Sequence, residues 1–403
     1  MVSTLLKRRE FIKYVSSMGA NATVALWMNQ SPLARFFLSS QGETRCLSCH
    51  QQSDKIDVTQ TQFKHDAAYV QCKLCVHHCI IAPGQRGQCN ARWNDNGQLK
   101  SLVYGRPVSL HVDPIEKKPL YHFYPGSSAF SLGTTGCPLS CKFCQNWQIS
   151  QASPEDYVTK DIISPNQIVS LAEQRTAQSI AFTYNEPTVF FEYAIDIAKE
   201  AKKKHIPTVM ISCGFMDPEP LKEMCEWFSA IKIDLKGFDQ AFYQEICGAS
   251  LEPVLKNIHY IHQTSVHLEL VNLLVPSLND SKTMITNMVK WVVAELGQDV
   301  PIHFTRFHPA YKMPNLAPTP KASLDMAYDI AKQHCIHYPY IGNFPGHAGN
   351  HTYCPSCGKM IILRTGFFIT DMHILNGRCQ YCQYPISGIW LHQSPTIKET
   401  SIP

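Results

Sequence analysis

The stretch "GCPLSCKFCQNW", residues 136–147, contains Cys137, Cys141 and Cys144 with the spacing C-x₃-C-x₂-C. It follows an apolar run, residues 128–133, that predicts a buried strand. Three thiolates can hold three corners of a cubic [4Fe–4S] cluster and leave the fourth iron open to another ligand. The alternative is a zinc or structural iron site that lacks one ligand.

Beyond this loop, apolar runs typical of strands alternate with helical patterns. We expect strands at 128–133, 179–184, 206–212, 230–235, 266–275 and 300–307, with a further short run at 336–341. We expect helices at 165–175, 188–204, 218–228, 251–263, 281–296 and 320–334. This alternation predicts an α/β fold with a parallel sheet, either doubly wound or an incomplete (β/α)₆ barrel.

Polar motifs follow these predicted strands. The motif "NEP" follows the second strand, "CGF" the third, "DLKG" the fourth and "FHP" the sixth. Because the carboxyl ends of parallel strands meet at one edge of the sheet, the sequence predicts a single cleft there.

The loop, with Phe143 before its last cysteine, resembles the signature of the radical S-adenosylmethionine (SAM) superfamily. The resemblance implies a partial (β/α)₆ TIM-like barrel and reductive cleavage of SAM to a 5′-deoxyadenosyl radical, which abstracts hydrogen from a substrate. It also implies roles for further residues. The SAM amino group would be held near Asn185 and Glu186, its carboxylate by Lys236 braced by Asp234, and its nucleoside near Ser212 and His308.

Residues 65–350 resemble the AmmeMemoRadiSam-system radical SAM enzymes, relatives of the pyruvate formate-lyase activating enzyme. The block "DPIEKKPLYHFYPG", residues 113–126, carries much of this resemblance. One departure is Pro138, which stands at the third position of the family's usual "GCN". The resemblance leaves the substrate open between a protein glycine and a small molecule.

Two further cysteine groups flank the predicted barrel. The first has the spacing C-x₂-C-x₃-C-x₉-C and comprises Cys72, Cys75, Cys79 and Cys89. It predicts a closed structural zinc site or, as the alternative, an auxiliary [4Fe–4S] cluster. The second has the spacing C-x₂-C-x₂₁-C-x₂-C and comprises Cys354, Cys357, Cys379 and Cys382. It predicts a zinc-ribbon or rubredoxin-type module that holds structural zinc or an iron able to relay an electron.

The predicted organisation has five parts. They are a leader at 1–40, a cysteine-rich segment at 41–125, the barrel at 126–349, the ribbon at 350–390 and a tail at 391–403. The leader contains Arg8 and Arg9, which resemble a twin-arginine signal. The motif "CLSCH", residues 46–50, fits either haem attachment or a metal knuckle.

Composition narrows the function. The chain has 403 residues, of which 44% are hydrophobic, and a formal net charge of only +4, so we expect no nucleic-acid partner. Thirteen of its 17 cysteines lie in metal-type groups, which favours a reducing, cytoplasmic location, whereas the leader favours export or membrane association. The main hypothesis is a radical SAM enzyme that needs a one-electron reductant. The rival hypotheses are an exported electron carrier with haem c and iron sites, and a zinc-ribbon module that recruits a partner.

Overall fold

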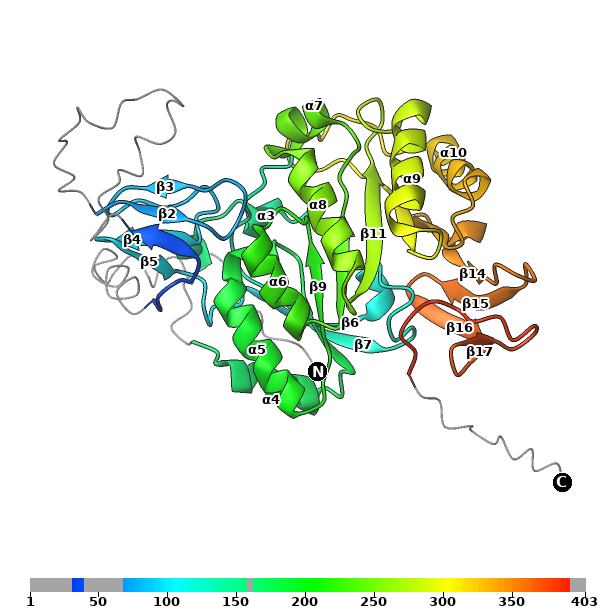
Figure 1. Ribbon diagram of the computed structural model, residues 1–403, viewed down its shortest axis with the longest axis horizontal. Helices are drawn as coiled ribbons and strands as arrows, with labels where there is room; N and C mark the ends of the chain where they lie inside the picture. The colour runs from blue at the N-terminus through cyan, green and yellow to red at the C-terminus, as the bar shows by residue number, and fades with distance from the viewer. Residues whose placement is uncertain (1–30, 40–67, 158–161, 392–403) are drawn as a thin grey trace, which may run out of the picture.

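The computed structural model describes residues 31–39, 68–157 and 162–391. The twin-arginine motif and the haem-type motif at 46–50 lie outside these residues and stay predictions. The described chain forms a central sheet with a small β unit at one end and a cysteine ribbon at the other (Figure 1).

The central sheet has eight strands in the order β13-β12-β11-β10-β9-β8-β7-β6. Their bounds are β6 Ser109–Pro114, β7 Ser128–Gly133, β8 Ser179–Phe182, β9 Thr208–Ser212, β10 Ala230–Asp234, β11 His267–Leu274, β12 Ile302–Arg306 and β13 Pro339–Gly342. Strand β6 is antiparallel to β7, and every later neighbour pairs in parallel. The seven parallel strands confirm the predicted runs. The sequence analysis did not predict β6, because this edge strand has no continuous apolar run.

The parallel strands are connected by helices. The α-helices of the described residues are α3 Trp147–Ser150, α4 Pro165–Gln174, α5 Phe191–Lys203, α6 Pro218–Trp227, α7 Gln240–Phe242, α8 Leu251–His262, α9 Lys282–Leu296 and α10 Lys321–Gln333. Because the strand order follows the sequence and such crossovers are right-handed, the helices gather on one face (Figure 1). A doubly wound sheet would instead reverse its strand order. Every helix within 31–39, 68–157 and 162–391 is too short or too polar to span a bilayer.

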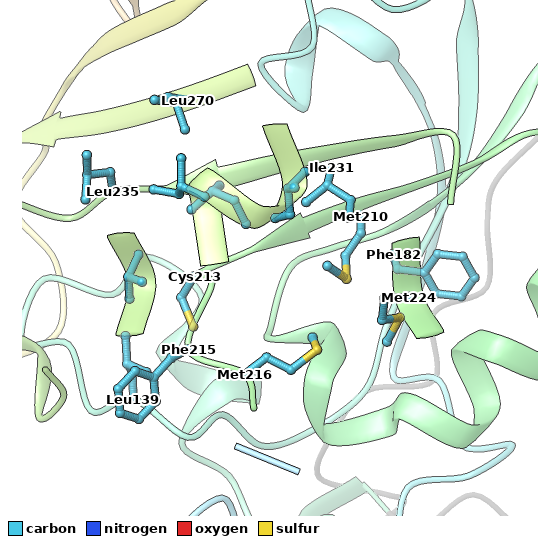
Figure 2. Packing of buried hydrophobic residues seen from close by; sticks show 14 of the residues in the cluster. Leu139, Phe182, Met210, Cys213, Phe215, Met216, Met224, Ile231, Leu235 and Leu270 are labelled. Carbon is cyan, nitrogen blue, oxygen red and sulfur yellow. The ribbon is translucent and has the colours of Figure 1, made fainter. Parts of the chain in front are cut away.

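Alternation along the strands separates two buried layers. Phe130, Ile180, Met210 and Ile231 belong to the large core that includes the helices, and Figure 2 shows Met210 and Ile231 among its members. The intervening residues are smaller. Ala129, Ala181, Val209 and Ala230 pack with Ile115, Leu120 and Phe123 on the opposite face. The segment that carries "IEKKPLYHF" therefore covers part of the face that the helices leave open.

The N-terminal unit contains two small sheets. Its strands are β1 Phe37–Ser39, β2 Val70–Cys72, β3 Ile80–Ile81, β4 Arg92–Asp95 and β5 Gln98–Ser101. Strand β1 lies within the segment predicted as a leader, but it pairs with β2. The unit is joined to the central fold by Arg92, which donates to Glu192 of α5 across 2.8 Å.

In the C-terminal ribbon, two antiparallel strands lie between the two cysteine pairs. Its strands are β14 Thr352–Tyr353, β15 Met360–Thr365, β16 Phe368–Met372, β17 Ile374–Leu375 and β18 Arg378–Cys379. The ribbon packs against the central fold through Tyr121, Tyr338 and Tyr340. The Arg364 guanidinium lies 3.9 Å from the centre of the Tyr121 ring.

Candidate active site

The cysteine loop begins where β7 ends and is fastened on both sides. The Gly136 amide donates to Ile149 of α3 at 2.9 Å, and the Ser140 amide donates to the Cys247 carbonyl at 2.9 Å. A Cβ atom at Gly133 would lie 2.5 Å from the Thr183 carbonyl oxygen, so only glycine permits this approach of β7 to the end of β8. The loop is therefore held against two neighbouring strand ends.

All three loop cysteines line one cavity of about 510 Å³. Residues from the "NEP", "CGF" and "DLKG" motifs line it too, namely Asn185, Glu186, Ser212, Asp234 and Lys236. The single cleft predicted from these strand ends is therefore present. His308 is different: it is exposed and is not among the cavity residues.

The sulfur atoms of the loop suit a cluster better than a single ion. A single metal ion needs ligand atoms that lie close together. Among the described residues, one group of three or more possible metal ligands has all its donor atoms within 4.8 Å of one another, and that group is in the ribbon. Cys137, Cys141 and Cys144 are thus spread more widely than the ligands of one metal ion. Three separate thiols facing a common cavity match the corners of a cubane, so these residues fit a [4Fe–4S] cluster.

The loop thiols differ in their surroundings. Burial raises the pKa of Cys137. By contrast, a hydrogen bond with Cys247 lowers the pKa of Cys141, and Lys236 lowers it further. Cys247 lies outside the predicted metal-binding groups, yet this contact places it beside a loop thiol.

Strand β10 places a charged triad on the cavity wall. Asp234 pairs with Lys232 and, at 2.8 Å, with Lys236. Burial alone would raise the pKa of Asp234, but the two lysines lower it to about 2. Burial alone would likewise lower the pKa of Lys236, yet Asp234 and Cys141 hold it well above its ordinary value. The triad therefore carries one net positive charge into the cavity beside the cysteines.

Lys232 was missed by the sequence analysis although a signal was present. In "IKIDLK", residues 231–236, every second residue is charged, and a strand directs such residues to one face. The same alternation that buries Ile231 and Ile233 in the helix-side core thus turns Lys232 toward the cavity with Asp234.

Glu186 and Asn185 of the "NEP" motif form hydrogen bonds that hold neighbouring segments together. The Glu186 carboxylate accepts from Ser212 Oγ at 2.7 Å and from the Cys213 amide at 2.7 Å. The Asn185 side-chain amide donates to the Gly136 carbonyl at 2.9 Å. These contacts join the ends of β8 and β9 to the cysteine loop and fix their relative positions.

Three further parts of the wall come from other segments. Tyr184 has a left-handed backbone (φ 73°), and its hydroxyl donates to Asp113 at 2.6 Å. Asp113 also pairs with Lys117 and Lys118, and both lysines line the cavity. Phe367, from the ribbon hairpin between β15 and β16, lines the cavity as well. The ribbon thus reaches the site that forms at the strand ends of the central sheet.

The other two cysteine groups do not line this cavity. Cys72, Cys75, Cys79 and Cys89 surround a smaller cavity in the N-terminal unit. The four ribbon sulfurs lie within 4.8 Å of one another and can bind a single metal ion.

Comparison with known proteins agrees with the site. The family model described as "Radical SAM superfamily" matches residues 131–289. An uncharacterized protein of Methanocaldococcus jannaschii is 41% identical over 321 residues, covering 79% of this chain and 95% of that protein.

Two activating enzymes are more distant. The (2S)-3-sulfopropanediol sulfolyase activating enzyme of Bilophila wadsworthia is 28% identical over 30% of this chain and 42% of its own length. The isethionate sulfite-lyase activating enzyme of Oleidesulfovibrio alaskensis is 22% identical over 32% of this chain and 45% of its own length. The chain therefore matches less than half of either enzyme. Taken with the cysteine loop and its cavity, these matches show that the chain is an enzyme that belongs to the radical SAM superfamily.

Proposed function

We propose that this protein reductively cleaves SAM to a 5′-deoxyadenosyl radical that abstracts a hydrogen atom from a substrate. The proposed scaffold is a partial (β/α)₆ barrel, supported by seven parallel strands in sequential order. One observation carries the proposal: Cys137, Cys141 and Cys144 face the same cavity of about 510 Å³ as the Asp234 triad.

Cys137, Cys141 and Cys144 would hold the [4Fe–4S] cluster, which when bound supplies the electron for cleavage of the sulfonium bond. Lys236 lies on the same wall as Cys141, and its positive charge suits a carboxylate. Asp234 keeps the Lys236 ammonium in place, and Lys232 offsets the charge of Asp234. We therefore assign the SAM carboxylate to Lys236, with Asp234 as its positioning residue.

Glu186 and Asn185 would influence SAM binding indirectly, because their hydrogen bonds hold the backbone around the cavity in place. Both Glu186 oxygens already accept hydrogen bonds within the protein, and its side chain is buried. Loss of the Glu186 and Asn185 hydrogen bonds would move the ends of β8 and β9 relative to the cysteine loop. Ser212, at the end of β9, lines the cavity where the nucleoside would lie.

The substrate is proposed to be another protein. The two activating enzymes that match part of this chain are named for a sulfolyase and a sulfite-lyase on which they act. A small-molecule substrate is the alternative, and either requires a one-electron reductant.

The ribbon is proposed to hold structural zinc. Its sulfurs lie 3.6 Å apart for Cys354 and Cys382, and 3.9 Å apart for Cys357 and Cys379. Zinc–sulfur bonds of about 2.3 Å in a tetrahedron place sulfurs about 3.8 Å apart.

The experiment is anaerobic incubation of the reconstituted protein with SAM and dithionite. We expect 5′-deoxyadenosine from the wild type and none above background from Cys141→Ala. Cys225→Ala, a matched control on α6 outside the cavity, should form the nucleoside at the wild-type rate. Equal yields from Cys141→Ala and the wild type would refute the proposal, as would a wild type that forms no nucleoside.

A further inference from the structure

The N-terminal unit contains a cavity enclosed by cysteines. All four, Cys72, Cys75, Cys79 and Cys89, line it. The centre of a water-sized sphere can move through about 20 Å³ of this cavity. One water molecule needs about 10–15 Å³ by the same measure, so the space between the cysteines is larger than one water molecule requires. Four thiolates closed on one metal ion would leave no such space, because each sulfur contacts the ion.

The sulfur spacing of the N-terminal group can be compared with that of the ribbon, whose four cysteines can bind a single metal ion. In the ribbon, all four sulfurs lie within 4.8 Å of one another. In the N-terminal group, no three sulfurs meet this limit, since the ribbon set is the one such group within the described residues. A cubane places each cysteine on a different iron and so requires sulfurs that are farther apart than around one ion.

The cavity also contains an incompletely paired cation. Arg92 lines it and is 1% exposed. Its Nη1 atom donates to Glu192, but Nε and Nη2 have no hydrogen-bond partner. A buried guanidinium with free donors is costly unless an acceptor is present. A four-cysteine cluster is anionic, and its sulfurs accept hydrogen bonds.

The sulfurs already receive hydrogen bonds of the kind that stabilise cluster ligands. The Gln88 amide donates to Cys79 Sγ at 3.5 Å. Backbone amides two residues along the chain donate to the sulfurs of Cys72, Cys75 and Cys89. Such bonds hold anionic sulfur and set the potential of a cluster.

The cysteine cavity lies directly against the candidate active site. His77 Nε2 is 2.8 Å from the carbonyl oxygen of Pro138, the residue after Cys137. Pro138 itself lines the N-terminal cavity. At Gly136, the residue before Cys137, an added Cβ would collide with the Cys89 carbonyl oxygen. The two cysteine segments therefore contact each other on both sides of Cys137, through the His77 side chain at Pro138 and through the Cys89 backbone at Gly136.

We propose that Cys72, Cys75, Cys79 and Cys89 hold a second [4Fe–4S] cluster, placed to deliver one electron to the site at Cys137. A low-potential one-electron carrier reduces this cluster, and the electron leaves it for the loop site with no bond or proton change. Only the use of the electron rests on the proposed function. The structural zinc site predicted from the spacing of these cysteines is replaced by this assignment.

Acid-labile sulfide tests the assignment, because neither a zinc site nor a single-iron ribbon contains it. The loop variant Cys137→Ala/Cys141→Ala/Cys144→Ala, purified anaerobically and reconstituted with iron and sulfide, should retain about four irons and four sulfides in a cubane. The N-terminal variant Cys72→Ala/Cys75→Ala should lose about the same amount from the wild-type total. A loop variant without sulfide, or with zinc in its place, would overturn the second cluster. A wild type with no more sulfide than the loop variant would instead refute the proposed function.

Two controls separate site loss from misfolding. Each variant should keep the ribbon metal, and Cys225→Ala should keep the full sulfide content. Electron paramagnetic resonance tests adjacency. The dithionite-reduced wild type should show a spectrum broadened by spin coupling, which differs from the sum of the two variant spectra. A wild-type spectrum equal to that sum would exclude the electron-transfer role.

Discussion

At the scale of single residues, charge pairing in the cavity has the largest consequences. Asp234 stands between Lys232 and Lys236, and all three side chains are at least three-quarters buried. The attraction of two lysines overcomes the burial of the carboxyl and lowers its pKa to about 2. The group is therefore ionised at any pH at which the enzyme would work.

Replacing this carboxylate should be costly. Asp234→Asn leaves two buried ammonium groups without a counter-charge, and we expect the free energy of unfolding to fall by about 3 kcal/mol. Guanidinium chloride denaturation measures it. The exposed pair Glu200–Lys203 provides the control, since Glu200→Gln should cost less than about 1 kcal/mol. Adding Lys232→Met to Asp234→Asn should restore part of the loss. An unchanged unfolding midpoint in Asp234→Asn would contradict the pairing argument.

At the scale of elements, helix α4 shows how local sequence sets a boundary. Ser164 precedes Pro165 at the first helical position. The Ser164 hydroxyl accepts from the Gln167 amide at 3.3 Å, and the Gln167 side chain accepts from the Ser164 amide at 2.8 Å. This reciprocal cap confirms the helix start that the Ser-Pro pair predicts.

Removing the cap should cost about 1 kcal/mol of unfolding free energy in Ser164→Ala. Ser170→Ala, within the same helix, is the matched control and should change stability by less than about 0.5 kcal/mol, since alanine favours helix. Denaturant unfolding of both variants gives the comparison. If both variants have the same stability, the cap does not stabilise α4.

At the scale of the whole molecule, the ribbon and the central fold share a buried interface. His122 lies between the two parts: its Nδ1 is 2.5 Å from the Ser387 carbonyl oxygen and its Nε2 is 2.6 Å from the Tyr340 hydroxyl. Burial lowers the pKa of His122 to about 4. The folded protein thus requires this histidine to be neutral.

This requirement predicts a pH dependence. Below the ordinary pKa of about 6.5, the unfolded chain binds a proton at His122 that the folded chain does not, so stability falls as pH falls toward 4. Between pH 6.5 and 5 the loss from His122 is about 2 kcal/mol. The free energy of unfolding should therefore vary less with pH in His122→Asn than in the wild type over this range. An identical pH slope in both proteins would refute the prediction.

Loss of the ribbon metal should loosen the same interface. Cys379 is buried in the ribbon, and we expect Cys379→Ser to lose about one metal ion per chain and to expose 351–391 to proteolysis. Metal analysis and limited proteolysis measure these effects. Cys335→Ser, at an exposed cysteine outside every group, should change neither. A ribbon that stays protease-resistant without metal would show that its packing on Tyr121 suffices.

The sequence by itself determined the features that repeat locally. Strand and helix positions, the α4 cap, the cysteine loop and the ribbon follow from periodicity and spacing, because each depends on residues close together in the chain. Only the tertiary structure decided which distant residues meet. It turned Lys232 toward the cysteines, brought Phe367 to the cavity, left His308 exposed and added β6 to the sheet. It also set the wide spacing of the sulfurs around Arg92, since distances between side chains depend on how separate segments pack.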